Sequence, residues 1–224
     1  MSLDPSFELS APVGSQLILT LRRRIVTGEL VPGTRLSEKE IAADYGLSRQ
    51  PVREAFIKLS ADRLVEVRPQ RGTFVCRIKI EDVMTSRFVR EAVEADIARL
   101  AATRADDAAI RLLRDMLDRQ RASLGAGGPV FMQLDEQFHR ALAETAGQAG
   151  AWLHLESIKM HMDRVRHLTA AELPVAPLVD QHAAIVEAVA ARDPDRAEGA
   201  VRAHLRGVLE HLEAMKLSLP DYFI

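Results

Sequence analysis

The sequence lacks the features of a secreted or membrane-bound protein. Its 224 residues include a single cysteine, Cys76, so an internal disulfide is excluded and a reducing, cytoplasmic location is expected. No apolar run approaches the roughly 20 residues of a membrane-spanning helix, so no membrane partner is expected. The first residues carry acids and no apolar core, unlike a signal peptide. With 47% hydrophobic and 28% charged residues, the composition is that of an ordinary globular chain.

The sequence also lacks an overall excess of positive charge. The net charge of −2 gives no indication of a nucleic-acid partner. This average hides an asymmetry, because residues 48–77 carry 7 Lys and Arg against 3 Asp and Glu, whereas residues 77–224 carry 19 against 23. A short basic segment bears on function only if it forms a recognition element.

The first 76 residues predict three helices followed by a β-hairpin. The stretch "GSQLILTLRRRIVTG" has apolar residues at helical spacing. A second helix begins at Ser37, with Glu40 three positions later as in a capping box, and a third begins at Ser48 with Pro51 in its first turn. Two short helices joined by a tight turn are typical of a helix-turn-helix. Two β-rich runs then flank the basic turn 69–72, which predicts a hairpin with a basic tip.

The third helix has the residues of a DNA recognition helix. Such a helix enters the major groove with its N-terminal end first, so its first turn meets base edges and phosphates. Arg49 and Arg53 are four residues apart and project together, and arginine can hold guanine or phosphate with two hydrogen bonds. The alternative is a solvated basic helix, which charge alone would favour. The predicted DNA contacts are Lys39, Ser48, Arg49, Gln50, Arg53, Arg71 and Gly72.

This part of the chain resembles the winged-helix domain of GntR transcription regulators. The stretches "GELVPGTRLSE", "SRQPVREA" and "RGTFV" match almost without gaps. The resemblance implies DNA contacts at the same positions that the groove argument selects. One departure is Arg63, where a glycine is usual before the pair Leu64–Val65.

The remainder of the chain predicts an all-α bundle of about six helices. No repeat of 20–50 residues is present. Helical patterns separated by Gly- and Pro-containing breaks occupy 80–104, 106–124, 129–146, 149–168, 175–191 and 194–216. The fold class is therefore mainly α, with a winged helix-turn-helix domain at 10–76, a linker at 77–81 and a helical domain at 82–216.

Four potential metal ligands lie on or beside the apolar stripes of three of these helices: Asp135, His139, His182 and His204. Buried charge is unfavourable unless it is paired, and a divalent metal would satisfy all four groups. The alternative is that each histidine is a hydrogen-bonded core residue. His154, His161, His167 and His211 are interpreted as such core residues or as surface residues. One Asp and three His suit zinc, which we favour, or nickel, manganese or iron(II).

A metal with open coordination positions can also indicate an enzyme. The sequence has no HExxH motif and no evident general base beside the ligands, so an enzyme is not expected. Residues 82–215 resemble the FCD effector domain of the FadR subfamily of GntR regulators, chiefly through "FVREAVEADIARLAA" and "LDEQFHRALAETAG". The resemblance implies a metal held by the four residues named above. A departure is Gln148–Ala149, where the family often has Asn-Pro.

The metal would leave positions for the carboxylate of a small organic acid. The resemblance implies that Arg90 faces the cavity, and Arg87, about one turn earlier, could assist as a second effector-binding residue. Arg164 and Arg166 are weaker candidates. The alternative for Arg87 and Arg90 is an ion pair with Glu91 or Glu94 on the helix surface.

The sequence thus predicts a transcription regulator, in the usual family mode a repressor, whose affinity for DNA is controlled by a small carboxylate at a metal site. The expected form is a homodimer on a pseudo-palindromic double-stranded operator. Two alternatives remain open. One is a regulator that senses the metal itself, and the other is a metal-dependent enzyme with a DNA-binding appendage.

Overall fold

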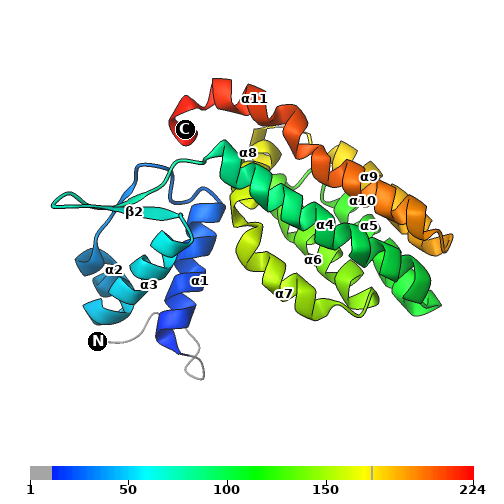
Figure 1. Cartoon of the computed structure of the whole chain (residues 1–224), viewed down its shortest axis with the longest axis horizontal. Coiled ribbons are helices and arrows are strands. Elements are labelled where there is room, and N and C mark those ends of the chain that lie inside the picture. Colours follow the sequence, from blue (N-terminus) through cyan, green and yellow to red (C-terminus); the bar gives the residue numbers. More distant parts are fainter. Residues whose placement is uncertain (1–11, 173) are drawn as a thin grey trace. The chain divides into compact units, whose positions relative to one another are not determined.

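The computed structural model describes residues 12–172 and 174–224, which fold into two compact units (Figure 1). One unit contains the described part of Met1–Lys79 together with Leu219–Ile224, and the other is Ile80–Ser218. Within the described residues, no helix is both long and apolar enough to cross a membrane. The predicted fold class, mainly α with a small sheet in the N-terminal part, is confirmed.

The N-terminal unit contains three helices and a three-stranded antiparallel sheet. In chain order its elements are α1 (Val13–Val26), β1 (Arg35–Leu36), α2 (Glu38–Asp44), α3 (Arg49–Ala61), β2 (Val65–Arg68) and β3 (Gly72–Val75). The buried stripe Leu17, Leu21 and Ile25 of α1 lies in the core of this unit, where α1 packs on α3. The Ser37 hydroxyl accepts a hydrogen bond from the Glu40 amide at 3.3 Å, so the predicted N-cap of α2 is formed.

The hairpin of β2 and β3 carries a third strand that the sequence did not predict. The strand order is β1-β3-β2, and Arg35 and Leu36 pair with Phe74 and Thr73. A strand of two residues is too short to show alternation in a sequence. Arg63, before β2, has φ +56, in the left-handed region that glycine adopts most easily. This conformation explains why glycine suits the position better.

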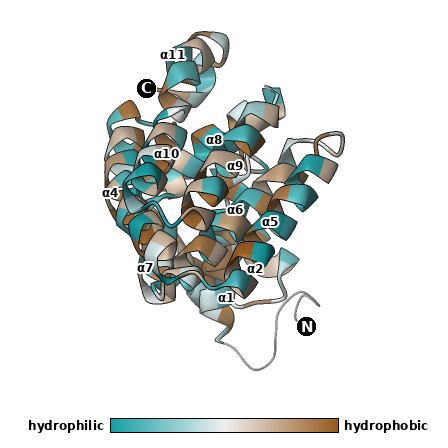
Figure 2. Cartoon of the chain, turned by 90° about the vertical axis from the view of Figure 1, so that its right-hand side faces the viewer, coloured by the Kyte–Doolittle hydropathy of each residue, from teal (hydrophilic) through white to brown (hydrophobic). Residues whose placement is uncertain are grey.

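The C-terminal unit is a helical bundle. Its elements are α4 (Ile80–Arg104), α5 (Asp107–Ala122), α6 (Gly128–Thr145), α7 (Ala149–Ile158), α8 (Met160–Glu172), α9 (Ala176–Ala190), α10 (Pro194–Arg206) and α11 (Val208–Ser218). Its main apolar core receives Ala98, Leu113, Phe138, Val186 and Val201 from five helices, and a smaller cluster contains Phe131, Met132, Ala170 and Val179. Figure 2 shows the mixed hydropathy of these helices, each with hydrophobic and hydrophilic stretches.

Two of the six predicted helices are divided in the structure. The helix expected at 149–168 breaks at Lys159, and α8 then continues to Glu172. The helix expected at 194–216 breaks at Gly207. Lys159, at the break, is buried, and its ammonium pairs with Glu136 and Asp163 at 2.7 and 2.6 Å. Neither break follows a proline, which is why the periodic pattern appeared continuous.

The C-terminal segment Leu219–Ile224 belongs to the N-terminal unit, which the sequence did not indicate. Phe223 forms a parallel bridge with Ile78, and both side chains are buried. The Ile78 amide donates to the Tyr222 carbonyl at 2.7 Å, and the Ile224 amide donates to the Ile78 carbonyl at 3.1 Å. The chain therefore passes between the two units twice, after Lys79 and after Ser218.

Candidate metal centre and DNA-contacting surface

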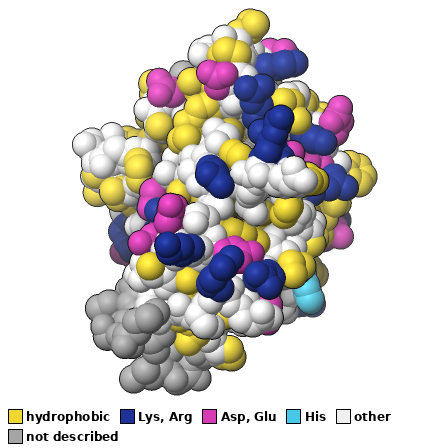
Figure 3. Space-filling view, turned by 90° about the vertical axis from the view of Figure 1, so that its left-hand side faces the viewer, with side chains coloured by type: hydrophobic (Ala, Val, Ile, Leu, Met, Phe, Trp, Pro, Cys, Tyr) yellow, Lys and Arg dark blue, Asp and Glu magenta, His cyan; other side chains and the backbone are white. Residues whose placement is uncertain are grey.

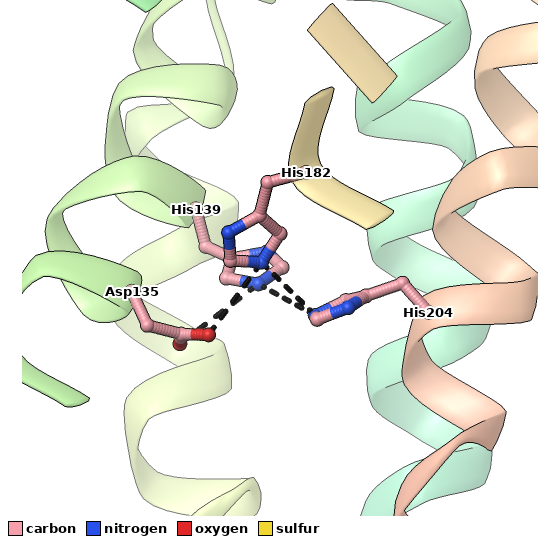
Figure 4. Close-up of side chains that lie close together, drawn as sticks. All are labelled: Asp135, His139, His182 and His204. Atoms are coloured by element: carbon pink, nitrogen blue, oxygen red, sulfur yellow. Dashed lines mark hydrogen bonds and ion pairs between the residues drawn. The ribbon is translucent and has the colours of Figure 1, made fainter. Parts of the chain in front are cut away.

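Four side chains converge in the core of the C-terminal unit (Figure 4). Asp135 and His139 project from α6, His182 from α9 and His204 from α10. One ligand atom from each lies within 4.8 Å of the others. Asp135 and His139 were expected at the border of the apolar face of α6, but both are buried. The structure thus brings together the four residues that the sequence proposed as ligands.

Each of the three imidazoles turns its Nδ1 atom outward, toward an oxygen acceptor. His182 Nδ1 lies 2.8 Å from Gln120 Oε1, and His204 Nδ1 lies 2.8 Å from Gln181 Oε1. His139 Nδ1 lies 2.6 Å from Glu94 Oε2. Because amide oxygens only accept hydrogen bonds, the Nδ1 atoms of His182 and His204 carry the hydrogen and their Nε2 atoms present lone pairs. His139 pairs with the Glu94 carboxylate instead.

The three Nε2 atoms meet at one place. His204 Nε2 lies 3.2 Å from His139 Nε2 and 3.3 Å from His182 Nε2. Asp135 Oδ1 is buried beside them without a hydrogen bond from the described residues. Two lone pairs cannot form a hydrogen bond, so the Nε2 atoms of His182 and His204 repel each other unless a cation lies among the four groups. The donor set of three nitrogens and one carboxylate fits a divalent transition metal.

The pKa shifts of three ligands favour the form that binds a metal. Burial lowers the pKa of His182 to about 3 and holds that of His204 well below its ordinary value, so both are neutral at pH 7. Burial would raise the pKa of Asp135, but the Arg166 guanidinium outweighs it, and the pKa lies well below the usual range. A neutral imidazole and an ionised carboxylate are the species that coordinate metals.

A cavity of about 130 Å³ opens beside this cluster. Arg166, Gln181 and His204 are polar residues of its wall. Much of the remaining wall is apolar and includes Met132, Met162, Val175, Leu178 and Leu205. The Arg166 guanidinium contacts Asp135 Oδ2 and donates to Asp163 Oδ1 at 2.9 Å. The cavity therefore offers an apolar compartment with a guanidinium and an imidazole at one side.

The two arginines that the sequence proposed for effector binding lie in α4, in ion pairs, and neither forms part of that wall. Arg87 pairs with Glu91, and Arg90 pairs through Nε with Glu94, as the alternative interpretation stated. Arg90 is fully buried, however, and its two terminal nitrogens have no hydrogen-bond acceptor among the described residues. A buried guanidinium with unused donors is a candidate to receive an anion.

Sequence reasoning missed the residues that contact the three imidazoles. Gln120 accepts from His182, Gln181 accepts from His204, and Glu94 pairs with His139. Arg166, considered from the sequence only as a weaker effector-binding candidate, neutralises Asp135. One signal was available, because Gln181 directly precedes His182. His211 was assigned no special role, yet it lines the cavity.

The predicted DNA-contacting residues lie on the N-terminal unit. Lys39, Ser48, Arg49, Gln50, Arg53 and Arg71 are exposed, and Gly72 is half-buried. The Ser48 side chain makes no capping bond, although Ser48 occupies the N-cap of α3, so the hydroxyl remains available for another partner. Figure 3 shows lysine and arginine side chains gathered on this side of the molecule, with acidic ones among them.

An acidic side chain lies between the two arginines of α3. Glu38, in the first turn of α2, accepts from Arg49 at 3.0 Å and from Arg53 at 3.3 and 3.2 Å. Hydrogen bonds from Arg53 lower the pKa of Glu38, so this carboxylate is ionised at neutral pH. The pair of arginines is therefore aligned before any DNA is present.

The hairpin tip has the backbone of a tight turn. Gln70 has φ +60 and Gly72 has φ +114, where side chains are disfavoured. A Cβ at Gly72 would also approach Arg35 Nε to 3.0 Å. Glycine at this position therefore leaves room for the Arg35 side chain.

Comparisons with known proteins agree with this organisation. Residues 14–75 match the family described as "Bacterial regulatory proteins, gntR family", and residues 87–207 match the FCD domain. The chain is 36% identical over 225 residues to the HTH-type transcriptional repressor RspR of Escherichia coli K12, covering 100% of this chain and 99% of the relative. A solved putative transcriptional regulator GntR from Rhodococcus sp. RHA1 is 29% identical with a TM-score of 0.72, covering 90% and 98% of the two chains. The solved E. coli McbR/YncC shares the fold, with a TM-score of 0.77 at 19% identity over 91% and 98% of the two chains.

Proposed function

This chain belongs to the gntR family of bacterial regulatory proteins and carries an FCD domain, and from that premise we propose that it is a repressor controlled by a small carboxylate bound at a metal. The predicted family is thereby confirmed, and the protein is a transcription regulator rather than an enzyme. The metal, the carboxylate and the homodimer are parts of the proposal.

One observation supports the metal above all. Three Nε2 atoms meet beside a buried carboxylate, and those of His182 and His204 are fixed as lone-pair donors by an amide oxygen at Nδ1. Partners of this kind orient ligand histidines and raise their basicity in known metal sites. Asp135, His139, His182 and His204 would hold the ion, zinc in the first instance. When bound, the metal would supply positive charge for an anionic ligand.

The chain's own residues favour a carboxylate with an apolar body. Arg166 and His204 mark the polar side of the cavity, and the apolar wall would receive the rest of the molecule. The two terminal nitrogens of Arg90 make no hydrogen bond with the described residues, although one of them lies 3.9 Å from Asp163 Oδ1. We therefore assign anion binding to Arg166 beside the metal. Arg90 remains the second candidate for binding the anion, with Arg87 as a residue that could assist it. A volume of about 130 Å³ suits a small organic acid.

The output surface is the first turn of α3 with the hairpin tip. Arg49 and Arg53 would read base edges or phosphate in the major groove, supported by Lys39, Ser48 and Gln50. Arg71 and Gly72 would approach the minor groove. A homodimer would place two such surfaces on a pseudo-palindromic operator, and the protein would act in the cytoplasm because its operator is there.

The metal-sensing regulator remains the second candidate, since the same four ligands would serve it. The two functions differ in what changes the operator affinity. In a sensor, mild chelation removes the metal and alters DNA binding by itself. In the proposed function the metal stays bound and an organic acid alters DNA binding.

The single tryptophan of the chain provides a direct test. Trp152 is buried and stacks on His139, with ring centroids 6.1 Å apart and planes 2° from parallel. We expect zinc added to chelator-treated protein to change Trp152 fluorescence at one equivalent per chain. The His182→Ala/His204→Ala double variant should show no such change and should contain no zinc by elemental analysis, whereas His154→Ala, at an exposed position, should behave as wild type. Stoichiometric zinc in the double variant would refute the ligand set.

A screen of organic acids on the zinc-loaded protein then tests the effector. A bound ligand raises the unfolding temperature by mass action, so even weak binders are detected. Acids that stabilise the wild type but not Arg166→Gln would support the assignment of Arg166. Stabilisation by acids of the double histidine variant would contradict the role of the metal.

A further inference from the structure

We propose that helix α11 and the segment Leu219–Ile224 carry the state of the metal site to the DNA-binding unit, as a second connection beside the linker at 77–81. The inference rests on the proposed function and concerns the regulation of that same site. Its basis is that one short stretch of chain begins at the site and ends in the other unit.

The first end of this stretch lies at the site. His204, one of the four ligands, is three residues before Gly207, where α10 ends. A Cβ at Gly207 would lie 3.3 Å from the His204 carbonyl oxygen and 3.7 Å from Gln181 Nε2. The backbone at Gly207 is therefore close to the Gln181 side chain, which accepts from His204. Helix α11 starts at the next residue, and its Glu210 and His211 line the cavity.

The other end is anchored in the N-terminal unit. The Ile78 amide donates to the Tyr222 carbonyl, and the Ile224 amide donates back to the Ile78 carbonyl, so two backbone hydrogen bonds hold the segment. Phe223 is 4% exposed and Ile78 is 1% exposed, which adds buried apolar contact. Ile78 lies between β3 and α4, at the point where the hairpin is joined to the C-terminal unit.

A cation in the cluster would act on α11 from two sides. It would draw the Nε2 atom of His204 toward the other ligands, next to the break at Gly207. It would also compete with Arg166 for Asp135, and Arg166 projects from α8, which packs against α11. The break after Arg206 lets α11 respond without moving the whole of α10, because the two helices are separate rigid pieces.

The anchored segment would pass such a movement to the hairpin. Ile78 is bonded to the segment on both its amide and its carbonyl, so a shift of α11 changes how often these bonds open. Linked sites of this kind typically change one another's affinities by about 5- to 150-fold. The conformation of the linker would then depend on α4, which follows it directly in the chain, and on α11, through the pairing of Phe223 with Ile78.

The test is amide hydrogen exchange on the full chain with and without zinc, the only ligand added. Ordering of the first turn of α11 should slow exchange at Ile78 and Ile224 about fivefold or more on zinc binding. The Cys76 amide, which donates to the Leu64 carbonyl in the same unit, is the internal control and should not respond. Binding itself is followed separately by Trp152 fluorescence.

Two variants separate the connection from the site. Phe223→Ala should bind zinc as the wild type does but lose the effect of zinc on exchange at Ile78. Leu217→Ala, at an exposed position of α11, should keep this effect. Zinc binding with no change at Ile78 and Ile224 in the wild type, or an undiminished zinc effect on exchange at Ile78 in Phe223→Ala, would overturn the inference and leave the proposed site standing. Absence of zinc binding would overturn the metal site itself and this inference with it.

Discussion

The two units use the same pair of chemical groups in opposite ways. In the N-terminal unit, Arg49 and Arg53 share Glu38, and the arginine side chains are 63% and 56% exposed. In the C-terminal unit, Arg166 pairs with Asp135, and the two side chains are 9% and 0% exposed. Exposed ion pairs contribute little to stability because water screens them, whereas an uncompensated buried charge is strongly destabilising.

This difference indicates how each unit is used. The exposed arginines can leave Glu38 for a phosphate or a guanine with little loss of stability. Arg166 can leave Asp135 only if another cation takes its place, which a metal would do. The surface pair suits reversible contact with DNA, and the buried pair suits an exchange of cations.

The largest expected difference between the two ion pairs appears when the arginine of each is removed. In metal-free protein, Arg166→Ala leaves Asp135 without its principal counter-charge and should lower the free energy of unfolding by about 3–5 kcal/mol. Arg53→Ala, the exposed counterpart, should lower it by less than about 1 kcal/mol. Urea denaturation of both variants measures the difference, and equal effects would show that burial does not separate the two pairs.

The next effect is on the pH dependence of stability. The pKa of His182 is about 3 in the folded chain, below its ordinary value of 6.5, so the unfolded state binds more protons between these values. Stability of the metal-free protein should therefore fall as the pH is lowered from 6.5, with a slope approaching about 1.4 kcal/mol per pH unit for this one group. His182→Leu should flatten the slope measured by urea denaturation, and His154→Ala should leave it unchanged.

The third prediction concerns the orientation of the ligands rather than their charge. Glu94→Gln replaces the carboxylate at His139 Nδ1 by an amide and should weaken zinc binding by about 10- to 100-fold. Asp96→Asn, at an exposed position of the same helix, serves as the control. Competition with a chelator of known affinity measures both. Equal zinc affinities of the two variants would remove Glu94 from the site.

The fourth prediction sharpens the account of the exposed arginines. Arg49→Ala should reduce specific operator affinity by about 1–3 kcal/mol and relax the preference for the contacted base, with an unchanged circular dichroism spectrum. Lys58→Ala, at an exposed position later in the same helix, should change operator affinity less. Footprinting on operator and unrelated DNA distinguishes the outcomes, and an unchanged footprint for Arg49→Ala would reject the recognition helix.

The smallest effect is expected at the shared acid. Glu38→Gln removes the charge that competes with DNA for Arg49 and Arg53, so non-specific affinity should rise a few-fold while stability changes by less than about 1 kcal/mol. Glu40→Gln, two positions later in the same helix, is the control because Glu40 is exposed and pairs with neither arginine in the structure. A fall in affinity for Glu38→Gln would instead mean that alignment by Glu38 outweighs its competition.

The sequence predicted the elements and ligands that depend on local pattern. Helical spacing places His182 and His204 on buried stripes, and that was enough to propose them together with Asp135 and His139. The partners of these imidazoles could not be predicted in the same way. Gln120 and Gln181 are ordinary polar residues until packing of α5, α9 and α10 brings them to His182 and His204.

Other features were hidden because they involve contacts between distant segments. The breaks at Lys159 and Gly207 carry no proline, so the periodic pattern passes through them. The pairing of Ile78 with Phe223 joins residues 145 positions apart. Glu38 appeared only as a residue of a capped helix start, although it holds both arginines of α3.

The position of Glu38 also has a consequence for how operator binding depends on salt. Each protein cation that neutralises a phosphate normally releases counterions from the DNA, and the affinity then falls steeply as salt is added. Arg49 and Arg53 come to the DNA from a carboxylate of their own protein, and salt weakens that internal pairing too. The logarithm of the operator affinity should therefore decline less steeply with salt than the number of phosphate contacts would suggest.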